Sequence, residues 1–109
     1  MAMFNPAHPG ELIREMLEGI REETGKKLTI QDVADGLHST RKTISAIING
    51  KQSITPEMSI KLGKAFNTGA EFWLRAQENY DLALARKKVD LRGIRIFWKS
   101  GNIGTISMA

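Results

Sequence analysis

A short basic stretch of the chain carries side chains suited to contacting bases and phosphates. Ile44, Ile47 and Ile48 recur at the spacing of one helix face, so the polar residues between them share the opposite face. A guanidinium matches the paired acceptors of guanine, whereas an ammonium suits phosphate. The polar face and the loop after it contain Thr40, Arg41, Lys42, Ser45, Ala46, Asn49, Lys51 and Gln52. We expect these residues to contact double-stranded DNA.

Each of these residues also has a simpler interpretation. The basic side chains could lie on an ordinary solvated helix face, and Lys51 and Gln52 could belong to a solvated loop. Asn49 could serve only to end the helix, and Ala46 could be small merely to avoid a clash. The run Arg86-Lys87-Lys88 is interpreted as favourable charge at a helix C-terminus rather than as a nucleic-acid contact.

Residues 29–50 have the pattern of two short helices joined by a tight turn. Thr29 and Asp32 predict a capping box at the first helix, and Thr40 predicts the cap of the second. The turn falls at His38-Ser39, and Gly50 predicts a left-handed C-terminal turn. A basic helix presented by a partner helix suits the major groove, which is a helix-turn-helix arrangement.

The rest of the chain predicts three further helices and one strand. A helix begins at Pro9 and ends at Gly25, and another begins after the cap Thr55 with Pro56 in its first position. A capping box over 68–71 opens a fifth helix to about Lys88. Alternation over 93–99 predicts a strand, which needs a partner such as the same strand of a second copy. We expect one all-α domain over 1–109 with this single C-terminal strand.

Charge is unevenly distributed along the chain. Residues 1–40 hold seven acidic against four basic residues, whereas residues 41–64 hold one against five and residues 86–99 one against six. An acidic face lies along the first predicted helix, formed by Glu11, Glu15, Glu18 and Glu22. This face is a candidate surface for a basic protein, although most such faces are only solvated.

Several classes of function have no support in the sequence. The absence of cysteine excludes a disulfide framework and cysteine-ligated zinc. His8 and His38 lack the spacing of a metal pair, and no nucleophile has an evident base. No apolar run has the length of a membrane span, and the N-terminus lacks a signal pattern. We expect a cytoplasmic protein that is not an enzyme, has no metal or cofactor, and does not contact a membrane.

The chain is predicted to have five helices, of which the second and third form the helix-turn-helix. In this it resembles the Cro/C1-type (Xre) helix-turn-helix family of phage repressors. Within that family it is most similar to the HigA antitoxins and the related VapI-type proteins. The segments that carry this resemblance are 8–11 (HPGE), 48–50 (ING), 54–58 (ITPEM), 64–66 (KAF), 71–74 (EFWL) and 77–82 (QENYDL), and it extends from about Asn5 to Phe97.

The resemblance implies an antitoxin that neutralises HigB, a small basic ribosome-dependent mRNA endonuclease, and that represses its own operon as a dimer on a palindromic operator. The family pattern differs at the turn, where Gly and an apolar residue usually replace His38 and Ser39. It also differs at Ile30, where a DNA-contacting Gln is common. These differences predict a less firmly packed turn and one polar DNA contact fewer.

Two alternatives to the antitoxin function remain open. One is a stand-alone regulator of the same fold, and the other is a protein-interaction module that no longer binds DNA. The aromatic residues of the fifth helix are interpreted as core or dimer surface rather than as a ligand site, and the predicted strand adds a second dimer contact. The residues predicted to contact a second copy are Phe72, Trp73, Tyr80, Leu84, Ile94, Ile96 and Trp98.

Overall fold

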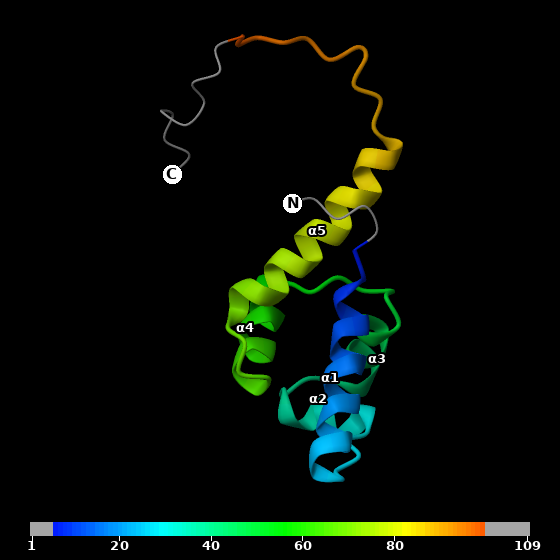
Figure 1. Ribbon diagram of the computed structural model, residues 1–109, viewed down its shortest axis with the longest axis vertical. Helices are drawn as coiled ribbons and strands as arrows, with labels where there is room; N and C mark the ends of the chain where they lie inside the picture. The colour runs from blue at the N-terminus through cyan, green and yellow to red at the C-terminus, as the bar shows by residue number, and fades with distance from the viewer. Residues whose placement is uncertain (1–5, 100–109) are drawn as a thin grey trace.

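The computed structural model describes residues 6–99, and five helices account for most of them (Figure 1). The helices are α1 (Pro9–Thr24), α2 (Ile30–Gly36), α3 (Arg41–Ile48), α4 (Pro56–Ala65) and α5 (Ala70–Lys88). The five predicted helices are therefore confirmed, and each begins within a residue or two of its predicted start. No described helix is long and apolar enough to cross a bilayer.

Four of the helix starts have side-chain caps, and those of α2, α3 and α4 are the caps that the sequence predicts. His8 Nδ1 accepts from the backbone N–H of Gly10 at 2.9 Å at the start of α1. Thr29 and Asp32 form a reciprocal capping box at α2. Thr40 and Thr55 cap α3 and α4 by accepting from the third residue of each helix. These caps satisfy N–H groups that a helix cannot pair internally.

The fifth helix begins differently from its prediction. Its N-cap is Gly69, with φ of 86°, and no side chain caps it. The hydroxyl of Thr68 instead accepts from the indole Nε1 of Trp73 at 2.8 Å. The predicted capping box is wrong because the buried indole N–H needs an acceptor and takes the hydroxyl that would otherwise have capped the helix.

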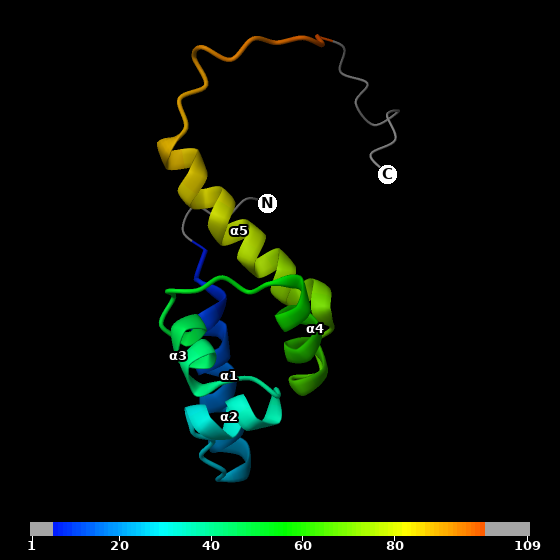
Figure 2. The same ribbon diagram turned by 180° about the vertical axis from the view of Figure 1, so that it is seen from behind.

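Helices α1, α2 and α3 form one group, and α4 lies beside them under the first half of α5 (Figures 1 and 2). The second half of α5 extends beyond the other helices in both views. The core between the helices consists of Ile13, Val33, Ala34, Leu37, Ile44, Ile47, Ile48, Ile54, Met58, Leu62 and Trp73. Three of these residues, Ile44, Ile47 and Ile48, belong to α3, so the core holds that helix in place.

Two glycines allow helices to approach closely. A methyl group at Gly10 would lie 2.8 Å from the carbonyl oxygen of Ile48, so the start of α1 contacts the backbone at the end of α3. A methyl group at Gly63 would lie 2.6 Å from the nitrogen of Ala70, where α4 meets α5. The glycine of the HPGE segment is therefore explained by the close packing of α1 on the end of α3.

The strand predicted over 93–99 is absent from the single chain. After α5, residues 89–99 turn once, with the N–H of Ile94 donating to the carbonyl of Leu91 at 3.0 Å, and then run away from the helices (Figure 1). Their apolar side chains are exposed, and that of Phe97 is 86% exposed. Alternation alone does not make a strand, because its backbone groups must pair with a neighbouring strand, so pairing with a second copy stays a prediction.

Candidate nucleic-acid interface

The exposed face of α3 has the composition that the sequence predicts. Ile44, Ile47 and Ile48 point into the core, whereas Arg41 and Lys42 are exposed in the first turn. Ser45 and Ala46 are half-buried, and the remaining predicted residues are exposed, namely Thr40, Asn49, Lys51 and Gln52. Among the described residues, no carboxylate forms an ion pair with Arg41 or Lys42. The face is therefore available to an anionic partner.

The turn between α2 and α3 is closed by backbone hydrogen bonds. The N–H of Ser39 donates to the carbonyl of Ala34 at 2.8 Å, and that of His38 donates to Asp35 at 3.2 Å. His38 takes the left-handed conformation, with φ of 51°, that glycine adopts at lower cost. Its ring is exposed rather than filling the turn, and its carbonyl accepts from Lys61 Nζ at 3.2 Å. The backbone hydrogen bonds close the turn without glycine, and the expectation that it is less firmly packed than in the family stays a prediction.

Ile30 fills a structural position in the first turn of α2. Its side chain packs against the core, beside the capping box formed by Thr29 and Asp32. The backbone N–H of Thr29 donates to the Asp32 carboxylate and holds the pKa of that group below its usual value. The position thus stabilises α2 on the core and supplies no polar group to a ligand.

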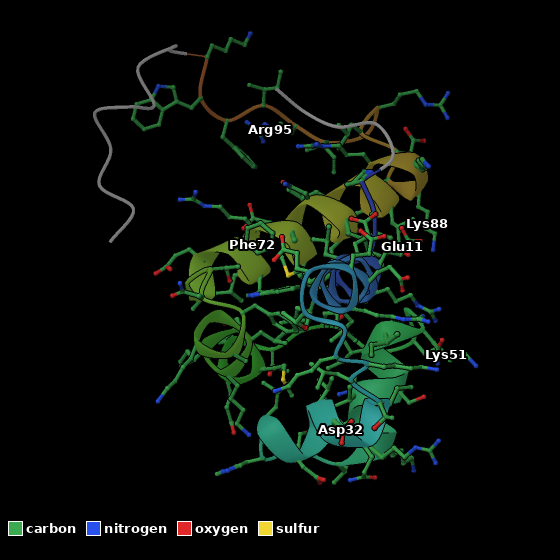
Figure 3. All side chains as sticks on the ribbon, turned by 60° about the horizontal axis from the view of Figure 1, so that its bottom comes forward. Glu11, Asp32, Lys51, Phe72, Lys88 and Arg95 are labelled. Atoms are coloured by element: carbon green, nitrogen blue, oxygen red, sulfur yellow. The ribbon has the colours of Figure 1, made fainter. Side chains whose placement is uncertain are left out.

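The loop that carries Lys51 and Gln52 is anchored from α5. The side-chain oxygen of Gln77 accepts from the backbone N–H of Ile54 at 2.8 Å, and its amide nitrogen donates to Asp81 at 3.0 Å. Gln77 is 5% exposed and Ile54 is 4% exposed, so water cannot replace this acceptor. At the other end of the loop, Gly50 has φ of 73° and Lys51 N–H donates to Ala46 at 2.8 Å. Lys51 therefore has a fixed backbone and a free side chain (Figure 3).

Arg14 is a residue of this surface that the sequence interpretation missed. Its Nη2 atom donates to the side-chain oxygen of Asn49 at 2.6 Å, across 35 positions in the chain. The Asn49 amide nitrogen donates in turn to Ser45 Oγ at 3.3 Å. Both Arg14 and Asn49 are exposed. No sequence pattern identifies such a pair, because it depends on how α1 crosses the end of α3.

A cleft of about 780 Å³ lies where the start of α1, the end of α3 and α5 meet. His8, Glu11, Arg14 and Glu15 line it from one side, and Asn49, Gly50 and Tyr80 line it from the others. The rings of His8 and Tyr80 meet edge to face, with centroids 4.9 Å apart. Burial lowers the pKa of His8, against the opposing effect of the negative charges of Asp81 and Glu11. A neutral imidazole keeps the lone pair that accepts from Gly10.

The four glutamates of the predicted acidic face are all exposed along α1. Glu18 lies 4.0 Å from Arg21, which is a solvated pair of little energetic weight. Glu11 and Glu15 reach the cleft at the end of α3, so the acidic face borders the candidate DNA interface.

The residues predicted to contact a second copy do not all lie on the surface. Trp73 is 0% exposed and belongs to the core of the single chain, so its assignment to a dimer surface is wrong. It is buried because Phe66 and Phe72 pack against it, with ring centroids 5.8 and 5.1 Å away. Tyr80 is half-buried against His8. The others are exposed and remain predictions: Phe72, Leu84, Ile94, Ile96 and Trp98.

Comparison with known proteins agrees with this geometry. The sequence profile of the helix-turn-helix family matches residues 17–73, more than half of the chain. The chain belongs to the Xre-type helix-turn-helix family. A family relative, virulence-associated protein A′ of Dichelobacter nodosus, is 38% identical over 102 residues, covering 93% of this chain and 83% of the relative.

Solved structures of this helix-turn-helix family include HigA antitoxins. An addiction module antidote protein of the HigA family from Coxiella burnetii is 34% identical and superposes with a TM-score of 0.65, over 77% of this chain and 86% of its own. The antitoxin HigA of Pseudomonas aeruginosa, solved with the higBA promoter, is 32% identical with a TM-score of 0.66, over 76% and 85%. The resemblance to HigA antitoxins inferred from the sequence is thereby confirmed.

Proposed function

We propose that this chain is a HigA-type antitoxin that represses transcription from its own operon by binding operator DNA. The observation that carries the proposal is the exposed polar face of α3, which begins with two unpaired cations and is held on the core by three buried isoleucines. A face of this kind places the first residues of the helix against base edges in the major groove. The structural match to an antitoxin solved with promoter DNA supports the same use of the surface.

A homodimer is the form in which this surface recognises an operator. A single eight-residue helix reads only a few base pairs, and two copies double the site. Their recognition helices would enter successive major grooves about 34–36 Å apart on a palindromic sequence. The exposed apolar residues of the C-terminal segment, Ile94, Ile96 and Trp98, supply apolar area for the contact between copies.

The dimer is tested by removing the residues after Val89. Sedimentation should give a higher dissociation constant for the shortened chain than for the full chain. As a control, the helical content of the two chains should match, because α5 ends at Lys88. An unchanged dissociation constant would assign the contact between copies to α5 alone or to another surface.

The acidic face of α1 is the surface we assign to the toxin, a small basic ribosome-dependent endonuclease. Four exposed glutamates on one helix attract a basic protein at long range and raise its rate of association. The antitoxin needs no catalytic group for this role, because neutralisation follows from covering the toxin. The face lies beside the DNA-contacting end of α3, so both partners would be bound by neighbouring parts of one domain.

The experiment that tests the antitoxin proposal is purification of the tagged chain from its native host. A small basic protein should co-purify in equal amount, and Glu15→Lys should weaken its retention. Glu78→Lys, an exposed acidic residue of α5 outside the acidic face, is the matched control and should retain the partner. If wild-type protein carries no such partner, the stand-alone regulator becomes the correct description.

A further inference from the structure

Arg14 makes an unusual choice of partner for an arginine on an exposed helix. Glu11 and Glu18 lie three residues before it and four after it, which are the positions of the usual ion-pair partners within a helix. The described structure has neither pair within 4.0 Å. Nη2 instead donates to Asn49 at 2.6 Å, so the guanidinium lies over the end of α3.

This contact fixes the orientation of the Asn49 amide. A guanidinium can only donate, so the group facing Arg14 must be the amide oxygen, and the amide nitrogen must face away from it. That nitrogen donates to Ser45 Oγ at the longer distance of 3.3 Å and has a second hydrogen. Asn49 therefore presents a donor at the surface, which is the group that a phosphate oxygen requires.

The charges around the cleft give Arg14 a second role. Glu11 and Glu15 line the same cleft as Asn49 and Gly50, and their carboxylates would repel a phosphate at the end of α3. Arg14 is the cation among the residues that line this cleft, and four of its five donors have no partner in the described structure. Lys51 projects on the same side of the molecule as Glu11 (Figure 3).

We propose that Arg14 is a positioning and phosphate-binding residue of the DNA interface, which orients Asn49 and contacts the same backbone phosphate. The proposal rests on the proposed DNA-binding function. The contact is to phosphate rather than to a base because the first residues of α3 face the bases, whereas Arg14 lies at the other end of that helix.

The test measures how affinity depends on salt for the wild-type chain and its variants. The probe is a labelled duplex recovered from a random library by wild-type protein, titrated between about 50 and 200 mM KCl. Arg14→Met should lower the slope of log affinity against log salt by about 0.9, the value of one phosphate contact. At 0.1 M salt this slope corresponds to about eightfold weaker binding. Arg14→Lys should keep the slope and bind less tightly than wild type, because an ammonium lacks the planar fork.

Arg21→Met is the matched control, because it removes the same charge from α1 near Glu18 and away from α3. It should leave the slope unchanged, and circular dichroism should show that all variants fold. Equal affinity and slope for Arg14→Met and Arg21→Met would overturn the phosphate contact. In a double-mutant cycle, Asn49→Ala should reduce the affinity for the duplex clearly less in the Arg14→Met variant than in the wild-type chain.

Two further outcomes separate the parts of the proposal. If the losses of DNA affinity caused by Arg14→Met and Asn49→Ala simply multiply in the double variant, the two residues act independently and the positioning role is overturned. A wild-type chain that selects and binds no duplex would overturn the DNA-binding function together with this inference. Wild-type binding with an unaffected Arg14→Met variant would overturn this inference alone.

Discussion

Replacing Gln77 by leucine should destabilise the domain through one backbone N–H group. The Gln77 side chain is the acceptor for the N–H of Ile54, at 2.8 Å, in a region where both residues are almost fully buried. Leucine is similar in size but accepts no hydrogen bond, so the N–H would be left without a partner. An orphaned buried donor costs about 1–3 kcal/mol. Loss of the bond from Gln77 to Asp81, four residues on, adds about 0.2–0.5 kcal/mol.

The chain contains a matched control for this change. Gln31 donates to Asp35, four residues on, at 2.8 Å, but on an exposed surface and with no contact to a loop. Gln31→Leu should therefore cost only about 0.2–0.5 kcal/mol. Urea denaturation followed by circular dichroism should give a difference of about 2 kcal/mol between the variants, which corresponds to about 8–16 °C in Tm for a domain of this size. Equal losses would refute the argument that Gln77 anchors the loop after α3.

Three further changes test the packing and the turns. Gly10→Ala should destabilise the chain by about 1–3 kcal/mol because the added methyl group meets the backbone of α3. Gly19→Ala, in the same helix, adds a methyl group that meets nothing and should stabilise the chain by about 0.5–1 kcal/mol. Thermal melts in which both variants shift Tm alike would contradict this. His38→Gly should stabilise the chain by about 1 kcal/mol in urea denaturation by relieving the left-handed backbone, and His38→Ala should not. Because burial lowers the pKa of His8, the unfolded chain binds a proton first as pH falls, so stability should decrease below about pH 6.5 and level off below the folded-state pKa. His8→Asn keeps a capping side chain that does not titrate, and its stability should lack this component of the pH dependence.

The sequence predicts local structure well where one residue and its near neighbours determine it. Thr29 with Asp32, Thr40 and Thr55 are caps whose partners lie three residues away, and all three predictions are confirmed. The isoleucines of α3 face the core as their spacing indicates. These features depend only on helix geometry, which the order of residues expresses directly.

The failures of prediction involve contacts between distant residues. The hydroxyl of Thr68 accepts from the indole N–H of Trp73 instead of capping α5, and Trp73 is buried by the packing of α5 on α4. Arg14 meets Asn49, and Gln77 meets Ile54, because of where helices cross, and neither pair has a signal in spacing or composition. The segment 93–99 alternates like a strand but has no strand partner within the described chain, and its pairing with a second copy stays a prediction. The surface of α3 could therefore be predicted, but the residues that brace it could not.

The most direct test of the account is a comparison of Arg41→Ala and Lys51→Ala in binding a duplex selected by wild-type protein. Arg41 lies in the first turn of α3, so its loss should weaken binding to the selected duplex by about 1–3 kcal/mol. Binding to random DNA should weaken less, so the ratio of the two affinities should fall. Lys51 lies in the loop beyond α3, so its loss should weaken both duplexes alike and lower the salt slope by about one. An Arg41→Ala protein that binds both duplexes as wild type does would contradict the assignment of α3 as the recognition helix.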